Sequence, residues 1–539
     1  MAPPRLAGNI KALALAALAA AALVDPGHAI ANASTTLAAE HGGAFNTWKS
    51  RIRRCQETDP AGYAAALAGS PHTGEVRRYI LTAAQDNTPV HGPFWANLLA
   101  FAAHVGAEVI VGGFTYQKGL FEDHAARSAV FATDVQPYLR HDRVDLGPID
   151  FCAEMNILPT ASRPLSGLET YTGAKWGVFP HAKVQLVSVP TLLVGQPKII
   201  MTTGAVTVQN YLPKKAGQKA VFHHVQGATL VEIDASGLPF CRQINATADG
   251  AFQDLDLQVR DGVVTGGHRV ECITWGDIHR EKIDPAIALA CWGLDVETDT
   301  IVAPGMIDVL RPRHQIMHDL LDFEARNHHR IHDHHHRFRM IKRGTDSVAD
   351  GIAASASFLR LTERDFCQTA VVPSNHHDAL TRWLVESDFR EDAANALVYL
   401  RCTTAIYEAM DRGDEGFDVF KWALQRADPT GLPGIIFVPR NGSYIICQGA
   451  GGIECAVHGH QGPNGSRGSP NAFTRVATKM ITGHTHVAGI LDGVYTAGLS
   501  GLFDQGYNDG ASSWSQTHVV TYPNGRRTLL TMHGRRWRA

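Results

Sequence analysis

Asp277 and His279 stand two residues apart at the end of a short apolar run, residues 270–275, that predicts a β-strand. Gly276, between this run and Asp277, allows the chain to turn sharply. Ligands bind at the carboxyl ends of the strands in open α/β sheets, so this carboxylate and this imidazole could hold a metal ion. The pair alone is weak support, because Asp and His are common in turns.

Four further apolar runs downstream also end in side chains with oxygen or imidazole donors. The groups that follow them are His318-Asp319-Leu-Leu-Asp322, Ser374-Asn375-His376-His377-Asp378, His458-Gly-His460 and Gly483-His484-Thr-His486. Because donors of the same kinds recur at the ends of several expected strands, we interpret them as one polar site and not as unrelated turns.

In this order the five groups resemble the D-x-H, D-x-x-D, N-H, H-G-H and G-H-x-H motifs of the calcineurin-like metallophosphoesterase superfamily, in its DNA-repair-exonuclease-like branch. The resemblance covers the chain from about residue 270 to the C-terminus. Two departures concern the second and third motifs. His318 stands where Gly is usual, and Ser374 also replaces a Gly while His377 intervenes before Asp378. Both departures keep the donor atoms and leave open which carboxylate orients His376.

The resemblance implies a centre of two divalent metal ions. It assigns Asp277, His279 and His486 to the first ion, Asn375, His458 and His484 to the second, and Asp319 to a bridge between them. His460 remains an alternative to His458, and Asp322 an alternative to Asp319. Mixed imidazole, carboxylate and amide ligands suit manganese, with iron or zinc as alternatives.

A phosphodiester is anionic and repels hydroxide, which is the problem that such a centre solves. Two ions about 3.5–4 Å apart activate a water molecule and neutralise the charge that develops at phosphorus. The resemblance leaves His376 outside the ligand set, beside Asn375, where it could donate a proton to the leaving oxygen. The motifs therefore predict hydrolysis of a phosphate ester.

The elements that position these residues must belong to more than one domain, because 539 residues exceed a single core. We expect an α/β protein with three parts. Residues 1–58 form a helical, helix-turn-helix-like unit, and residues 74–268 form an α/β domain of unknown role. Residues 269–539 form a metallophosphoesterase domain, for which the resemblance implies a four-layer α/β-β/α sandwich, with a helical insertion at about residues 379–428.

Composition sets limits on the compartment and on the partners. A hydrophobic content of 45% with 19% charged residues is that of an ordinary globular protein, and the net charge of −3 does not indicate a nucleic-acid binder by itself. Nine cysteines without a C-x-x-C pair favour reduced thiols and the cytoplasm. No segment has the apolar length of a transmembrane helix, so we expect no membrane partner.

Local basic residues near the N-terminus are candidates for contacts with DNA phosphates. They are Lys49, Arg51, Arg53 and Arg54, in a stretch that resembles a helix-turn-helix. The alternative is a helical assembly module with a solvated basic face. Before it, the Ala-rich residues 12–24 predict a helix, with a signal peptide and secretion as the alternative.

Residues 322–330 are expected to form a helix that leaves the second motif. We expect Arg326, Asn327, His328 and His329 on it to contact the substrate, because the helix begins at an expected metal ligand. The neighbouring residues 332–336 are also rich in His, and there we favour a solvated face.

Further stretches, such as 84–91 and 163–172, resemble a family of early proteins of large tailed phages that take part in host DNA degradation and DNA transfer. The resulting hypothesis is a metal-dependent deoxyribonuclease that works in the host cytoplasm, with DNA as its partner and a homo-oligomeric assembly. One alternative is a nucleotide phosphomonoesterase with the same metal site. The other is a DNA-binding or assembly protein in which the metal centre is secondary.

Overall fold

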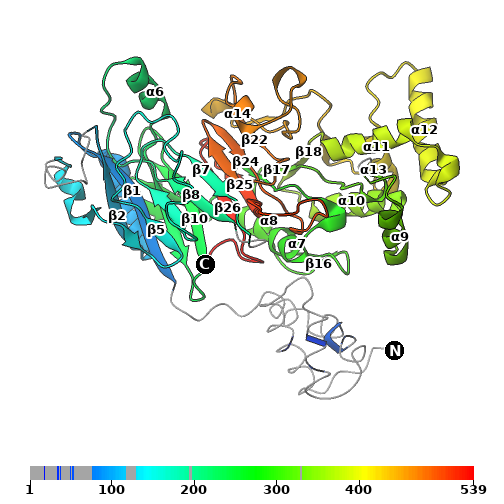
Figure 1. Ribbon diagram of the computed structural model, residues 1–539, viewed down its shortest axis with the longest axis horizontal. Coiled ribbons are helices and arrows are strands. Elements are labelled where there is room, and N and C mark those ends of the chain that lie inside the picture. The colour runs from blue at the N-terminus through cyan, green and yellow to red at the C-terminus, as the bar shows by residue number, and fades with distance from the viewer. Residues whose placement is uncertain are drawn as a thin grey trace.

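The computed structural model describes residues 76–116, 129–192, 197–327 and 330–539, together with positions 17, 33–34, 37, 49 and 51–53. Within these residues the chain is an α/β fold of several mixed sheets and flanking helices, as expected (Figure 1). The helix-turn-helix-like unit expected for residues 1–58 lies almost entirely outside the described residues, as do Arg54, His328 and His329.

A six-stranded sheet carries the first three motifs. Its order is β19-β18-β17-β14-β25-β26. The strands are β14 (Cys272–Thr274), β17 (His314–Met317), β18 (Gln368–Val371), β19 (Ile435–Phe437), β25 (Thr517–Thr521) and β26 (Arg527–Thr531). The first four strands are parallel, and Cys272 pairs with His314, which pairs with Gln368. Because these parallel strands are in register, the residues that follow them emerge at one edge of the sheet. β25 and β26 form an antiparallel hairpin near the C-terminus.

A ten-stranded sheet carries the last two motifs, and its order is β20-β21-β22-β24-β23-β7-β8-β6-β5-β4. Its later strands are β20 (Ile445–Ile446), β21 (Ile453–Glu454), β22 (Lys479–Thr482), β23 (Gly489–Leu491) and β24 (Val494–Thr496). Its earlier strands are β4 (Val144–Asp145), β5 (Ile149–Phe151), β6 (Trp176–Phe179), β7 (Leu186–Val189) and β8 (Lys198–Thr202). β7 and β23 pair antiparallel, so strands from both sides of residue 268 share this sheet.

A five-stranded sheet, in the order β10-β9-β1-β2-β3, is built only from the first half of the chain. Its strands are β1 (Arg77–Gln85), β2 (Glu108–Phe114), β3 (Leu139–Arg140), β9 (Gly227–Ile233) and β10 (Pro239–Asn245). Helix α5 (Gly92–Val105) packs on it through Phe94, Leu98 and Phe101, and ends at Gly106 in the left-handed conformation. Short sheets are formed by β11 (Phe252–Asp254), β12 (Leu257–Arg260) and β13 (Val263–Thr265), and by β15 (Leu294–Asp295) and β16 (Thr300–Ile301).

Two apolar cores enclose the six-stranded sheet. One core joins it to the large sheet and to the five-stranded sheet, with Ile316, Val519, Ile481 and Leu81 among its members. The other lies under helices α7 (Pro285–Trp292), α8 (Met306–Leu310), α10 (Val348–Thr362), α11 (Asn375–Glu386) and α13 (Val419–Ala427). Burial on both faces explains why even polar residues of these strands, such as Gln315 and Thr369, are buried.

The helical insertion comprises α11, α12 (Ala396–Asp411) and α13, at the end of the molecule away from β1 (Figure 1). It begins at Asn375, and so inside the third motif. The remaining helices are α6 (Lys215–His223), α9 (His334–Arg343) and α14 (Pro470–Phe473), with short 3-10 turns at Thr133–Tyr138, Arg280–Lys282, Glu324–Arg326, Phe389–Glu391, Gln448–Ala450 and Pro463–Gly465. None of the described helices is long and apolar enough to cross a membrane.

Candidate metal centre

The five motifs meet at one edge, where the two large sheets face each other. Asp277, His279 and Asp319 leave the six-stranded sheet, and His458 and His486 leave the large sheet. All five side chains are buried. His458 follows β21, with residues 455–457 between the end of that strand and the histidine.

Backbone strain is concentrated at these residues. His279, Asp319, His484 and His486 have φ values of 44°, 44°, 72° and 57°. A residue with a Cβ pays a steric cost in this left-handed region, and such conformations persist where packing enforces them, often at functional sites. The turns therefore hold the donor side chains in fixed directions.

Asp277, His279 and His486 form a compact group. The two imidazole Nε2 atoms lie 3.1 Å apart, and His486 Nε2 lies 3.2 Å from Asp277 Oδ2. The His484 backbone N–H donates to the same oxygen at 2.8 Å. Two imidazole nitrogens and a carboxylate at this spacing can hold a metal ion.

Asp319 lies at the centre of the cluster. Its Oδ2 is 3.2 Å from His458 Nε2, 3.7 Å from His279 Nε2 and 3.9 Å from His376 Nε2. With Asp277 and His458 it forms a second group of ligand atoms that lie within 4.8 Å of one another. The geometry therefore favours Asp319 over Asp322 as the shared carboxylate, and His458 over His460 beside it.

Three oxygens at this centre are buried and accept no hydrogen bond: Oδ1 of Asp277, Oδ1 of Asp319 and Oδ1 of Asn375. A buried acceptor without a partner is costly, about 1–3 kcal/mol for a neutral group and more for a charged one. Although burial opposes ionisation, His458 and His486 lower the pKa of Asp277 to about 2, and His376 and His458 keep the pKa of Asp319 well below its usual value. Ionised carboxylates with one buried oxygen that accepts no hydrogen bond are what a cation site requires, so the residues present fit a metal centre.

Asn375 and His484 complete the expected ligand set from two further segments. Asn375 is the first residue of α11, whose N-cap Ser374 accepts from the His377 N–H. The His484 ring packs edge-on against His458 at 5.2 Å, and burial lowers its pKa to about 4, so the ring is neutral. The described residues form a third group of ligand atoms within 4.8 Å of one another, from His279, Asp322 and His376. His484 belongs to none of the three groups.

Asp322 orients two of the histidines. Its carboxylate is 2.9 Å from His279 Nδ1 and 3.6 Å from His376 Nδ1, and its carbonyl accepts from His376 Nδ1 at 2.7 Å. Asp378, the other candidate to orient His376, instead pairs with Arg440 at 2.5 Å. A carboxylate behind a ligand His fixes its tautomer and ring orientation. The Asp322 carboxylate also lies within 4.8 Å of ligand atoms of His279 and His376, so it is a candidate ligand as well.

Burial would lower the pKa of His376, but the Asp319 and Asp322 carboxylates outweigh it and raise the pKa to about 9. The ring is therefore protonated at neutral pH. Because Nδ1 donates to the Asp322 carbonyl, Nε2 is the nitrogen left to donate toward Asp319 and the cluster.

One comparison with known proteins identifies the family. Protein A1 of Escherichia phage T5 is 39% identical to this chain over 490 residues, which is 89% of this chain and 86% of Protein A1. This chain belongs to the Protein A1 family. The resemblance to a phage protein is thereby confirmed. No family model matches the chain, and no solved structure matches it.

Arg326 does not line the pocket that lies over the cluster, which corrects our expectation. Its guanidinium is buried and forms ion pairs with Asp346 and Asp392. The expected helix is absent here, because Phe323 adopts a left-handed conformation and only the 3-10 turn Glu324–Arg326 follows. Asn327 does line the pocket.

His377 and His318, the two departures from the superfamily motifs, have structural contacts. His377 is buried, stacks on Phe420 at 3.9 Å, and accepts from the Leu320 N–H. His318 is buried against His458, with their Nδ1 atoms 3.4 Å apart. Both rings therefore pack the loops that carry the donors.

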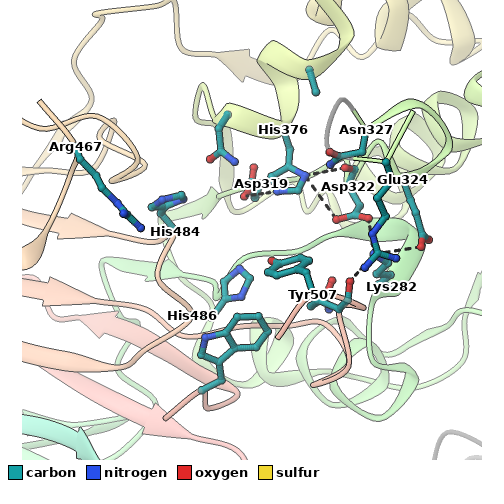
Figure 2. A pocket seen from close by; sticks show the side chains of 15 residues that line it. Lys282, Asp319, Asp322, Glu324, Asn327, His376, Arg467, His484, His486 and Tyr507 are labelled. Atoms are coloured by element: carbon teal, nitrogen blue, oxygen red, sulfur yellow. Dashed lines mark hydrogen bonds and ion pairs between the residues drawn. The ribbon is translucent and has the colours of Figure 1, made fainter. Parts of the chain in front are cut away.

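The pocket over the cluster has a volume of about 490 Å³ (Figure 2). Sequence reasoning missed several residues of its walls, among them Lys282, Arg467, Tyr507 and Trp514. They come from separate loops with no regular spacing, so the sequence offered no signal for them. At the N-terminus, Arg53 forms an ion pair with Glu297 at 3.3 Å, and Lys49 and Arg51 are helical residues that do not line the pocket.

Proposed function

We propose that the chain is a two-metal phosphodiesterase of the calcineurin-like metallophosphoesterase type that hydrolyses DNA. The observation that carries this proposal is the convergence of imidazoles with three buried oxygens that accept no hydrogen bond. The donors are also those that the superfamily motifs name. Membership in a phage protein family supports DNA as the substrate.

The residues that would hold the ions are Asp277, His279 and His486 on one side, Asn375, His458 and His484 on the other, and Asp319 between them. Bound there, a pair of divalent ions, for which manganese is the first choice, would supply charge neutralisation and an activated water molecule. The rigid turns of the four strained residues would keep the donors in place without reorganisation.

His376 would act as the general acid. Its Nε2–H would donate a proton to the ester oxygen as the P–O bond breaks, so that the product leaves as an alcohol. Asp322 would hold the ring through Nδ1, which leaves Nε2 as the nitrogen that carries the donated proton.

The host cytoplasm is the proposed compartment. All eight described cysteines are buried free thiols, which suits a reducing environment.

A parallel assay distinguishes this proposal from the two alternatives. Purified protein with manganese is offered linear DNA, circular DNA and nucleoside monophosphates. We expect hydrolysis of DNA and little release of phosphate from the monophosphates. Release of phosphate alone would support the phosphomonoesterase, and binding of DNA without hydrolysis would support the DNA-binding or assembly protein.

We also propose that the homo-oligomer forms through α12. The helix exposes Leu397, Leu400, Tyr407 and Met410 on one side, and it stands at the edge of the molecule (Figure 1). Leu397 and Met410 are equally far from the middle of the helix, as are Leu400 and Tyr407. Two copies packed antiparallel about a twofold axis would therefore match apolar residues in pairs, as an isologous interface requires.

The charges on α12 fit the same arrangement. Arg401 and Glu408 are both exposed and flank the apolar stripe. In the antiparallel pair, Arg401 of one copy would lie within two residues of Glu408 of the second copy. A second copy of this chain is therefore the occupant that we assign to this face.

A further inference from the structure

An aromatic pair forms one wall of the pocket above the metal centre. Tyr507 and Trp514 lie with their ring centroids 5.9 Å apart, and Trp514 packs edge-on against His486 at 4.4 Å. Tyr507 is 53% exposed. In Figure 2 its ring lies beside His486 and points into the pocket.

An exposed aromatic ring next to a highly charged centre calls for an explanation. A phosphate alone makes no use of such a surface, because it is recognised by charge and hydrogen bonds. A nucleobase does, because every base has a flat face that stacks on Tyr or Trp, at about 1–3 kcal/mol per base. The aromatic wall therefore fits a base that is adjacent to the reacting phosphate.

Two arginines line the same pocket. Among the described residues, neither Arg330 nor Arg467 has a carboxylate within ion-pair distance, whereas Arg326 is paired twice. The Arg330 guanidinium lies against Gly506, next to Tyr507. Arg467 reaches toward His484 from the other side (Figure 2).

Lys282, the third cation of the pocket, is occupied differently. Its Nζ is 3.0 Å from Asp322 and 3.4 Å from Glu324. Among the Lys and Arg side chains of the pocket, the charge left for a ligand is thus that of the two arginines, which suit phosphate oxygens.

We propose that the enzyme takes an unstacked nucleotide into this pocket, with its base on Tyr507 and Trp514 and neighbouring phosphates on Arg330 and Arg467. This inference rests on the proposed phosphodiesterase function and adds its substrate class, which is single-stranded DNA or a frayed end. A volume of about 490 Å³ lies within the range of small-ligand pockets. A base inside a closed duplex must first leave its stack at a cost of a few kcal/mol.

The test uses two substrates with the same leaving group: thymidine 5′-(4-nitrophenyl) phosphate and methyl 4-nitrophenyl phosphate. Only the first has a base. We expect the wild type to prefer the thymidine ester in kcat/KM, mainly through KM. Tyr507→Ala should reduce this preference about tenfold, within the energy of one stacked base, and Tyr507→Phe should keep it because the ring remains.

Phe222→Ala is the matched control, since Phe222 is an exposed aromatic residue that does not line the pocket. A second measurement needs no variant: the wild type should cut single-stranded circular DNA faster than closed duplex circles. Equal use of both esters, or equal rates on both circles, would overturn the base-stacking inference and leave the phosphodiesterase standing. If the wild type hydrolyses neither ester and neither circle, the base-stacking inference and the proposed phosphodiesterase function are both wrong.

Discussion

At the scale of the residue, the most specific feature is the protonated His376 between Asp319 and Asp322. If it is the general acid, its loss should matter most when the leaving oxygen is a poor one. We expect His376→Asn to slow DNA cleavage by about 10²–10⁴-fold and to slow cleavage of a nitrophenyl diester much less. The rates on both substrates and the metal content are to be measured together.

The matched control for this experiment is His335→Asn, the same change at an exposed position on α9. His377 cannot serve, because it is buried against Phe420 and any substitution there disturbs packing. Equal losses on both substrates would show that His376 acts through charge or as a ligand, and so would loss of bound metal.

The types and order of the donors could be predicted from the sequence, because each group of donors follows within a few residues of a strand. The partner of His376 could not. Asp322 and Asp378 are both near it in the motifs, and only the turn at Phe323 places Asp322 behind the ring. The expectation that Arg326 contacts the substrate was wrong for the same reason, because the partners of its guanidinium are 20 and 66 residues away in the sequence.

At the scale of the element, the N-terminus of α11 depends on a ring stack. Phe420 of α13 lies face-on against His377, with an interplanar angle of 15°. The residues that precede His377 in the chain, Asn375 and His376, are the ones that face the cluster. We expect Phe420→Ala to lower the free energy of unfolding by about 3–5 kcal/mol and to weaken metal binding. Phe338→Ala, on the exposed side of α9, should change neither. Unchanged stability and metal affinity in Phe420→Ala would rule out this supporting role.

Local sequence is enough to indicate a strand where an apolar run is continuous, as in β1, β2 and β9. The joining of β7 to β23 was not predictable, because nothing local in either strand specifies a partner 300 residues away. Sheet edges are decided by tertiary packing, which residue periodicity does not record.

At the scale of the whole molecule, buried histidines should make stability depend on pH. Burial lowers the pKa of His181 and His224 from 6.5 to about 4, and that of His518 to about 3. The folded state therefore holds these rings neutral, while the unfolded chain protonates them near pH 6.5. Their contribution is complete above pH 6.5 and is lost as the pH falls toward 4.

For His181 the full loss amounts to about 3 kcal/mol. The ring accepts from the Lys183 N–H and contacts the Leu158 carbonyl. His181→Asn keeps an acceptor without a titrating group, so its melting temperature should fall less between pH 7 and pH 5 than that of the wild type. A parallel decline in both proteins would show that His181 does not titrate on unfolding.

The interface proposed for α12 predicts a change in mass. Leu400→Glu together with Tyr407→Glu would place four carboxylates in the interface of two copies, and we expect the assembly to become smaller. Light scattering after size-exclusion chromatography measures this. Val263→Glu and Phe222→Glu, which are equally exposed changes elsewhere, should leave the mass unchanged. An unchanged mass in the α12 variant would place the interface on another surface.

The central claim is that Asp319 joins two metal ions in a centre that hydrolyses DNA. Its most direct test is to count the metal ions per chain and to measure DNA cleavage in the same preparations of the wild type and of Asp319→Asn. We expect about two manganese ions and active cleavage in the wild type. In Asp319→Asn we expect at least one ion to be lost, with cleavage abolished in a folded protein. Wild-type cleavage by Asp319→Asn, or an active wild type that contains no metal, would contradict the account.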